Sequence, residues 1–266
     1  MLLRPHYLFK YKTVGCKEDL EKLKEILNEN RLYLPDIFEL NDPFEGIPVN
    51  VQFGYAGSSI NADLGNIDIF YESKLKEYKL ISFSSIVNSP IMWAHYTNQY
   101  RGCCIIFSTK NTLKKVEPII YTDTIFDVND NKDAYENLSK IAHEALKIKK
   151  RDWSYENEWR YIKKTSDKFL KLRKKEIIGI IIGENMNDAY QEEIASICES
   201  KGIWCIKPKI MLSKSEMKFI PYDCKRNISF GKAVSEIKSY EFKELISTLN
   251  GEESPSSYYN SDEIRL

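Results

Sequence analysis

Hydrophobic residues recur with two different periods along the chain, and these periods predict a mixture of helices and strands. Leu20, Leu23 and Leu27 lie three or four positions apart, which is the spacing of one buried helix face. The pattern predicts helices over residues 18–28, 67–79, 90–95, 132–151, 187–201 and 233–249. It predicts strands over residues 7–12, 31–34, 80–84, 102–108, 116–121, 156–163, 176–182 and 203–206.

Several residues indicate where the predicted elements end and how deeply they are buried. The nearly continuous apolar run Gly102–Ser108 predicts a strand buried on both faces, whereas Pro118 predicts an edge position for its own strand. Gly202 is a natural end for the helix over 187–201, so the unit from 176 to 206 is a strand, a helix and a strand, which we expect to be parallel and right-handed. Residues 35–48 and 49–66 are predicted to be a loop and an irregular excursion.

Length and composition favour one globular domain. A chain of 266 residues with 42% hydrophobic residues can bury a full core without covalent staples. Together with the predicted elements, this gives an α+β fold over residues 1–249, in which a mixed, mostly antiparallel β core is flanked by helices. Residues 250–266 hold little that can be buried and are predicted to form a mobile tail.

The charge pattern gives no broad nucleic-acid footprint. The formal net charge is zero, and Lys and Arg are not gathered in one arm. Two local basic stretches, Lys147–Arg151 and Lys163–Lys175, are expected to be solvated faces, although either could line a local groove.

The cysteines and the apolar runs indicate a cytoplasmic protein. None of the six cysteines forms a C-x-x-C pair, and the start of the chain soon turns polar, so we expect no signal peptide and reduced thiols. No apolar run approaches the roughly 18 residues that span a bilayer. No spacing of ligating residues predicts a metal site, and phosphate-binding glycine motifs and a G-x-S-x-G elbow are absent from the sequence.

The segment Trp153–Arg160 is the strongest candidate for chemistry. If residues 155–162 form a strand, Glu156, Glu158 and Arg160 share one face, and the two carboxylates lie about 7 Å apart. We expect repulsion to raise the pKa of one carboxyl where water is excluded, which suits a carboxylate held for a sugar hydroxyl or for acid–base work. The alternative is an exposed strand face whose Arg–Glu pair contributes well under ~1 kcal/mol.

Two other segments carry candidate residues. The loop Asn41-Asp-Pro-Phe-Glu45 either presents Asp42 or Glu45 to a cleft or is a structural turn anchored by Phe44. Ser82 and Ser84 share one face of a predicted strand, and the helix that follows carries Trp93, His95 and Tyr96. A histidine can act as base, donor or ligand near neutral pH, although a lone histidine is more often structural.

These segments together resemble the bacterial proteins catalogued as domain of unknown function 2971. The matching pieces run in the family's order over about residues 7–185 and are quite specific as a set. They are Leu8–Lys12, Asn41–Glu45, Ile81–Ser84, Met92–Tyr96 with Gly102, Trp153 with Tyr155–Arg160, and Ile177–Gly183.

In layout the chain also resembles ADP-ribosyltransferase-like proteins, including DNA-targeting toxins. Those proteins have a first strand, a helix, a short Leu-Tyr-Leu strand, a serine-bearing strand and a late strand with the key glutamate, which holds a ribose hydroxyl of NAD. The resemblance implies NAD as substrate, Glu158 or Glu156 as this carboxylate, and Arg160 in support. It implies a NAD pocket framed by further residues from the segments above: Tyr11, Lys12, Asn41, Asp42, Glu45, Ser82, Ser84, Trp93, His95 and Tyr96.

The leading hypothesis is therefore a NAD-using, ADP-ribosyltransferase-like effector, of toxin or phage-defence type, that acts on a nucleic-acid or protein acceptor. One alternative is a module that binds a nucleotide, a nucleic acid or a protein without chemistry. Another is a metal-dependent, nuclease-like hydrolase that uses Asp42, Glu45 and the pair Glu156 and Glu158. The oligomeric state does not follow from the sequence.

Overall fold

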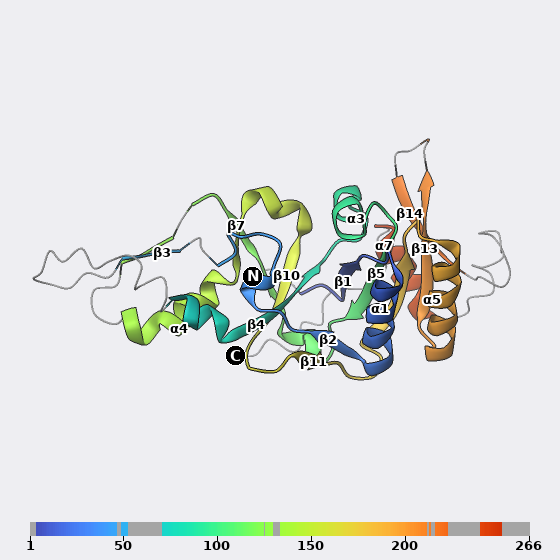
Figure 1. Ribbon diagram of the computed structural model, residues 1–266. Coiled ribbons are helices and arrows are strands. Elements are labelled where there is room, and N and C mark those ends of the chain that lie inside the picture. Colours follow the sequence, from blue (N-terminus) through green and yellow to red (C-terminus); the bar gives the residue numbers. More distant parts are fainter. Residues whose placement is uncertain are drawn as a thin grey trace, which may run out of the picture. The chain divides into compact units, whose positions relative to one another are not determined.

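A computed structural model describes residues 4–46, 49–52, 71–124, 126–129, 134–211, 213, 216–222 and 240–251. Within these residues the fold is α+β, as predicted, and one mixed, mostly antiparallel sheet holds eight strands (Figure 1). In sheet order these are β14 (Glu216–Pro221), β13 (Trp204–Met211), β12 (Ile177–Ile182), β5 (Cys103–Ser108), β1 (Tyr7–Lys12), β4 (Tyr78–Ser84), β10 (Glu158–Lys164) and β6 (Glu117–Pro118).

The chain divides into two compact units. Unit 1 consists of Met1–Asn30, Phe83–Lys114 and Leu172–Leu266, and unit 2 of Arg31–Ser82 and Lys115–Lys171. The prediction of one domain over residues 1–249 stays a prediction. Most of the predicted tail, residues 252–266, lies outside the described residues.

Unit 1 is built around the strand β5, which is buried along its whole length. Every residue of β5 is buried, which confirms the expectation from its apolar run. On one side β5 pairs antiparallel with β1, and on the other it pairs antiparallel with β12. Strand β12 then pairs parallel with β13, and α5 (Asp188–Lys201) packs on both strands. The predicted unit is therefore parallel, and Gly202 ends α5 in a left-handed conformation with φ of 64°.

The remaining elements of unit 1 cover its strands. They are α1 (Lys17–Glu29), α3 (Pro90–Tyr96), the short 3-10 helix η2 (Thr112–Lys115, which ends in unit 2) and α7 (Tyr240–Leu249). The apolar face of α1 is buried as predicted. Asn250 follows α7, and its side-chain amide bonds to both the N–H and the carbonyl of Phe219 in β14. This amide satisfies main-chain groups of a strand that ends the sheet order.

A buried carboxylate joins two segments of unit 1. Glu176 is wholly buried and accepts hydrogen bonds from the Thr112 hydroxyl at 2.6 Å and the Leu113 amide at 3.3 Å, and from the amides of Thr112 and Arg173. We expect Glu176→Gln to lower the free energy of unfolding by about 2 kcal/mol, because the neutral amide turns a donor toward other donors. Urea unfolding measures this, with the exposed Glu184→Gln as control within about 0.5 kcal/mol of wild type. Equal losses in the two variants would contradict the prediction.

Unit 2 has its own hydrophobic core. Residues 71–76 are helical, and their buried side chains pack with those of β4, of the 3-10 helix η1 (Ile37–Glu39) and of α4 (Ala134–Ala145). The core consists of Ile37, Tyr71, Leu75, Tyr78, Leu80, Ala142, Ala145 and Leu146.

Three two-stranded sheets belong to unit 2 as well. Strands β2 (Arg31–Tyr33) and β11 (Phe169–Lys171) pair antiparallel. The other two pairs are parallel: β3 (Val49–Gln52) with β8 (Phe126–Asn129), and β7 (Ile120–Thr122) with β9 (Ile148–Lys150).

Three predictions in unit 2 were wrong in detail. The helix predicted over 132–151 ends at Ala145, and a turn then leads into β9. The strand predicted over 116–121 is two strands, and the one with Pro118 ends the sheet order, as expected of an edge strand. The excursion predicted over 49–66 begins with β3, and its residues 53–66 lie outside the described residues.

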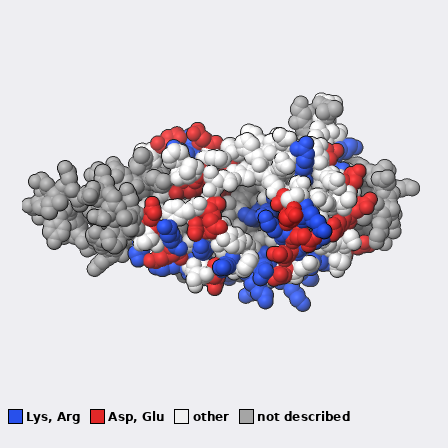
Figure 2. All heavy atoms as spheres, in the orientation of Figure 1, with Lys and Arg blue, Asp and Glu red and all other residues white. Residues whose placement is uncertain are grey.

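The structure also describes the surface charges, the length of the helices and the state of the cysteines. Acidic and basic side chains are interspersed on the face that Figure 2 shows, in keeping with the net charge of zero. None of the described helices is long and apolar enough to cross a membrane. The described cysteines, which leave out Cys224, are free thiols.

Candidate functional site

The segment Trp153–Arg160 is a tight turn followed by a strand, where a continuous strand had been predicted. Residues Arg151–Glu156 form the 3-10 helix η3, and Asn157 follows in a left-handed conformation with φ of 44°, which Asn tolerates better than most residues. Strand β10 starts only at Glu158. The prediction that Glu156 and Glu158 share a strand face was therefore wrong, but the turn brings both carboxylates to the same cation.

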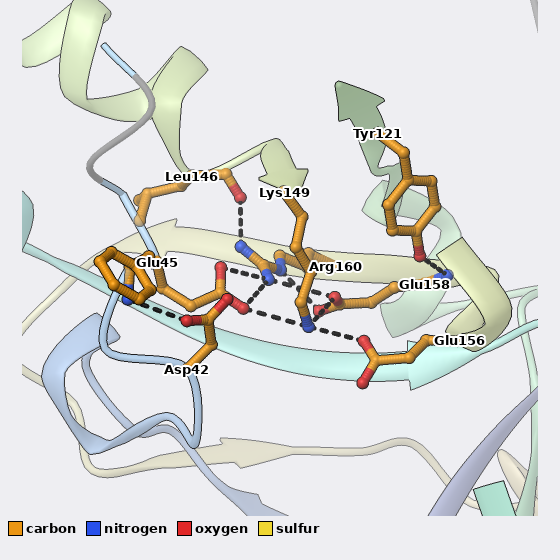
Figure 3. A network of polar contacts seen from close by, with 9 residues as sticks. Asp42, Glu45, Tyr121, Leu146, Lys149, Glu156, Glu158 and Arg160 are labelled. Carbon is orange, nitrogen blue, oxygen red and sulfur yellow. Dashed lines mark hydrogen bonds and ion pairs between the residues drawn. The ribbon is translucent and has the colours of Figure 1, made fainter. Parts of the chain in front are cut away.

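That cation is Lys149, which lies in β9 and is buried. Its Nζ lies 2.6 Å from Glu156 Oε2, 3.1 Å from Glu158 Oε2 and 3.1 Å from Glu45 Oε1 (Figure 3). The ring of Trp153 lies 4.8 Å from the same ammonium group, in reach of a cation–π contact. Three carboxylates, one from the loop 41–45 and two from the turn that leads into β10, thus converge on one ammonium group.

Arg160 is the second cation, and its side chain is fully buried. Its Nη2 bonds both oxygens of Glu45 at 2.8 Å, while its Nε donates to Glu158 Oε1 at 2.6 Å. Its Nη1 donates to the carbonyl oxygen of Leu146 at 2.7 Å. All three nitrogens are bonded, so the planar guanidinium fixes the geometry of two carboxylates and of the turn after α4 (Figure 3).

We call this set the buried charge cluster: Glu45, Lys149, Glu156, Glu158 and Arg160. Three carboxylates face two cations, so the cluster carries one net negative charge when all five groups are ionised. The alternative of an exposed strand face with a weak ion pair was therefore wrong. Burying unbalanced charge is unfavourable unless a function or further partners compensate for it.

The electrostatics of Glu158 differ from the prediction. Burial alone would raise its pKa, but the charges of Arg160 and Lys149, with hydrogen bonds from Arg160 and Ser82, outweigh burial and lower the pKa to about 2. The expectation that repulsion raises a carboxyl pKa was wrong for this residue. Burial likewise opposes the charge of Lys149, but the three carboxylates raise its pKa above the ordinary value. Both groups stay ionised at neutral pH, which suits electrostatic stabilisation better than proton transfer.

Other predicted residues of unit 2 lie beside the cluster or shape its loop. Ser82 in β4 hydrogen-bonds Glu158. Asp42 is buried, and its Oδ1 accepts a hydrogen bond from the Phe44 amide at 2.9 Å, which stabilises the turn that carries Glu45. Asn41 is exposed.

Three of the predicted residues of unit 1 bond the same main-chain segment, Ile86 and Val87. Tyr11 and Ser84 both donate to the carbonyl oxygen of Ile86 at 3.0 Å, and Trp93 Nε1 donates to the carbonyl oxygen of Val87 at 2.7 Å. The rings of Tyr11 and Trp93 meet edge to face at 5.4 Å. These contacts give the three side chains structural roles.

The other predicted residues of unit 1 are more open to solvent. Lys12 and Tyr96 are half-buried and His95 is exposed, with its ring 6.3 Å from that of Tyr96. Tyr100, which the sequence did not single out, stacks on Trp93 with ring centroids 5.8 Å apart.

The comparisons with known proteins concern the part of the chain that holds most of the cluster. A family model described as "Protein of unknown function (DUF2971)" matches residues 92–161. Over these residues the chain is similar to that family. No curated protein and no solved structure matches. The likeness to this DUF2971 family thus includes Trp93, Lys149 and Arg160, and nothing in the comparisons supports the resemblance to ADP-ribosyltransferase-like proteins.

Two residues of the DUF2971-like segment were missed from the sequence. Lys149 lies in a segment that was predicted to be the end of a helix. Charge balance could have identified it, because three buried carboxylates need a second cation besides Arg160. Tyr121 gave no such signal. Its hydroxyl oxygen accepts a hydrogen bond from the Glu158 amide at 2.8 Å and so fixes the start of β10.

The hypothesis of a metal-dependent hydrolase requires side chains that can hold a metal ion together. Among the described residues, no group of three His, Cys, Asp or Glu side chains is arranged to hold a metal ion. The three carboxylates that come closest to such a group surround the ammonium of Lys149.

Proposed function

We propose that the protein is a NAD-using enzyme of the ADP-ribosyltransferase type, in which Glu158 and Glu156 stabilise the reacting ribose. The observation that carries the proposal is a buried cluster in which three carboxylates surround two cations and those cations hold Glu158 ionised. Such a cluster favours a transition state in which positive charge moves from the nicotinamide ring onto the ribose.

The strand order supports this choice of reaction. The layout resemblance puts the key glutamate on a late strand and a serine on a middle strand. Here β10, which begins with Glu158, is the neighbour of β4, and β4 is the neighbour of β1. The hydrogen bond between Ser82 and Glu158 joins the predicted serine to the predicted carboxylate.

The chemistry is loss of nicotinamide from NAD. The glycosidic C–N bond breaks, its electron pair leaves with nicotinamide, and the ribose carbon becomes oxocarbenium-like until the acceptor or water attacks it. The excess negative charge of the cluster stabilises this cation in a region where water screens little. Glu158 Oε2 has two contacts of 3.1 Å, to Lys149 and Arg160, and is the oxygen that a ribose hydroxyl would engage by replacing one of them.

Labelled NAD with purified protein and cell extract tests the proposal. We expect hydrolysis or transfer by wild type and a loss of at least about 100-fold in Glu156→Gln and Glu158→Gln, the scale of removing one transition-state contact. Glu192→Gln on the exposed face of α5 is the matched control and keeps full activity. Because Glu158 bonds two buried cations, melting curves must show that each variant is folded. Wild type that neither hydrolyses nor transfers NAD would refute the proposal.

A binding module without chemistry is the second candidate. It is favoured by the low exposure of Glu45, Glu156 and Glu158, which are each buried and ion-paired. A rise in melting temperature with NAD or another nucleotide, with no product formed, would select this candidate over the enzyme.

A further inference from the structure

Exposed aromatic rings are a feature of unit 2 alone within the part of the chain that the structure describes. Unit 1 exposes aliphatic side chains among its large hydrophobics, such as Ile91 and Ile210. The exposed aromatic side chains of unit 2 are Tyr33 (49% exposed), Phe38 (49%), Phe44 (55%) and Phe169 (41%). A lysine or arginine lies over the ring of each Phe at 4.0–5.2 Å: Arg31 on Phe169, Lys76 on Phe38 and Lys150 on Phe44.

The pair β2 and β11 brings two of these rings together. Its register pairs Phe169 with Tyr33, Leu170 with Leu32 and Lys171 with Arg31. The central leucines are buried, so the flanking pairs share the opposite, outer face of this small sheet. We call this outer face, made of Arg31, Tyr33, Phe169 and Lys171, the β2–β11 face.

The rings of the β2–β11 face are held in place. Tyr33 and Phe169 meet edge to face with centroids 5.9 Å apart, and the guanidinium of Arg31 lies 4.0 Å from the Phe169 ring. The Tyr33 hydroxyl donates to Glu39 at 2.7 Å, which fixes the far end of that ring. A platform that is already ordered loses little entropy when a flat group stacks on it.

Two cations of this face lie opposite each other in the strand register. Like charges directly opposite each other on neighbouring strands are destabilising, and Lys171 and Arg31 are such a pair. An anionic ligand that bridges them would remove this penalty. Lys168 adds a third cation at the start of β11, where its carbonyl accepts a hydrogen bond from Leu34, while the nearby Asp167 is paired with Lys163 at 2.9 Å.

We propose that the β2–β11 face binds single-stranded nucleic acid, with bases stacked on Tyr33 and Phe169 and phosphates on Arg31 and Lys171. Aromatic platforms bordered by cations are the usual means of binding single strands without sequence preference. Lys171 of this face belongs to the basic run Lys163–Lys175, which the buried charge cluster does not use. The binding is independent of NAD and is measured without it.

Fluorescence anisotropy with labelled 12-mer oligo(dT) and oligo(U) tests this proposal. We expect wild type to bind both, and Tyr33→Leu/Phe169→Leu to bind about tenfold more weakly, which is about 1.4 kcal/mol. Leucine keeps the apolar volume of the sheet but lacks the ring face. Lys171→Ala should reduce the slope of log affinity against log salt by about one. Ile210→Ala and Lys110→Ala, at exposed sites in unit 1, are the matched controls and bind as wild type does.

Three outcomes would overturn the proposal. The first is no binding by wild type at about 50 mM salt, where phosphate contacts are strong. The second is equal binding by the leucine variant. The third is equal or tighter binding of a duplex of the same length. Either result would show that stacking of unpaired bases does not contribute to the binding. Wild type that binds anionic lipid vesicles but not oligonucleotides would assign the surface to a membrane instead. A difference between oligo(dT) and oligo(U) would identify which nucleic acid the protein prefers.

Discussion

Replacing Arg160 with Met is expected to lower the free energy of unfolding by about 3–5 kcal/mol. Methionine has nearly the length of the arginine stem but no charge and no donors. The change leaves Glu45 and Glu158 buried with one cation fewer, and it removes the donor to the Leu146 carbonyl. The cluster would then hold three carboxylates against Lys149 alone, which is the costly case of a buried ion pair that has lost one partner.

Urea unfolding of Arg160→Met checks this expectation, and Arg151→Met is the matched control. Arg151 also forms an ion pair, with Asp123 at 2.8 Å, but both side chains are about two-thirds exposed (64% and 68%), so its loss should change stability by less than about 1 kcal/mol. If the urea midpoint of Arg160→Met is as close to that of wild type as the midpoint of Arg151→Met is, the cluster contributes little to stability.

Acid is expected to remove about 3 kcal/mol of stability through Glu158. Its pKa is about 2 in the folded protein against an ordinary 4.5, and each unit corresponds to about 1.4 kcal/mol. Because the folded-state pKa is the lower one, the unfolded chain binds the proton first as the pH falls. The contribution is therefore complete above about pH 5 and is lost as the pH falls toward about 2.

Unfolding free energies at about pH 6 and about pH 3 measure the part of this loss that falls between the two pH values, about 2 kcal/mol. Glu158→Gln has no carboxyl to protonate at this position, so its stability should differ less between the two pH values than that of wild type. Glu192→Gln, on an exposed face, should follow wild type. If Glu158→Gln loses as much stability as wild type on acidification, other carboxyls cause the acid sensitivity.

The fold was predictable where one pattern dominates a segment. The apolar run of β5 and the capped α5 between two parallel strands were recognised because their burial follows directly from their own residues. The turn after Ala145 was missed because the basic and apolar residues up to Arg151 continue a helical pattern. In the structure Leu146 is held by Arg160 and Lys149 by Glu45, and both partners lie outside that segment.

The candidate cluster was predictable in its residues but not in its geometry. Alternation along a strand predicted that Glu156, Glu158 and Arg160 lie together. The motif over residues 41–45 identified Glu45 as a candidate. The left-handed Asn157 broke the alternation, and the partners of Arg160 depend on a contact with Glu45 across 115 positions of sequence. No local pattern encodes a contact of that separation. The fall in the pKa of Glu158 was not foreseen because Lys149, one of the two cations that cause it, was not identified from the sequence.

Release of nicotinamide from NAD by the purified protein is the most direct test of the proposed chemistry. Glu158→Asp is the most informative variant, because it keeps the charge balance with Lys149 and Arg160 while it withdraws the carboxylate by about one bond length, roughly 1.5 Å. We predict that wild type releases nicotinamide steadily and that Glu158→Asp releases it about 100-fold or more slowly. The melting curve of Glu158→Asp must show that this variant is folded. Release that is absent from wild type, or unchanged in the folded variant, would contradict the account.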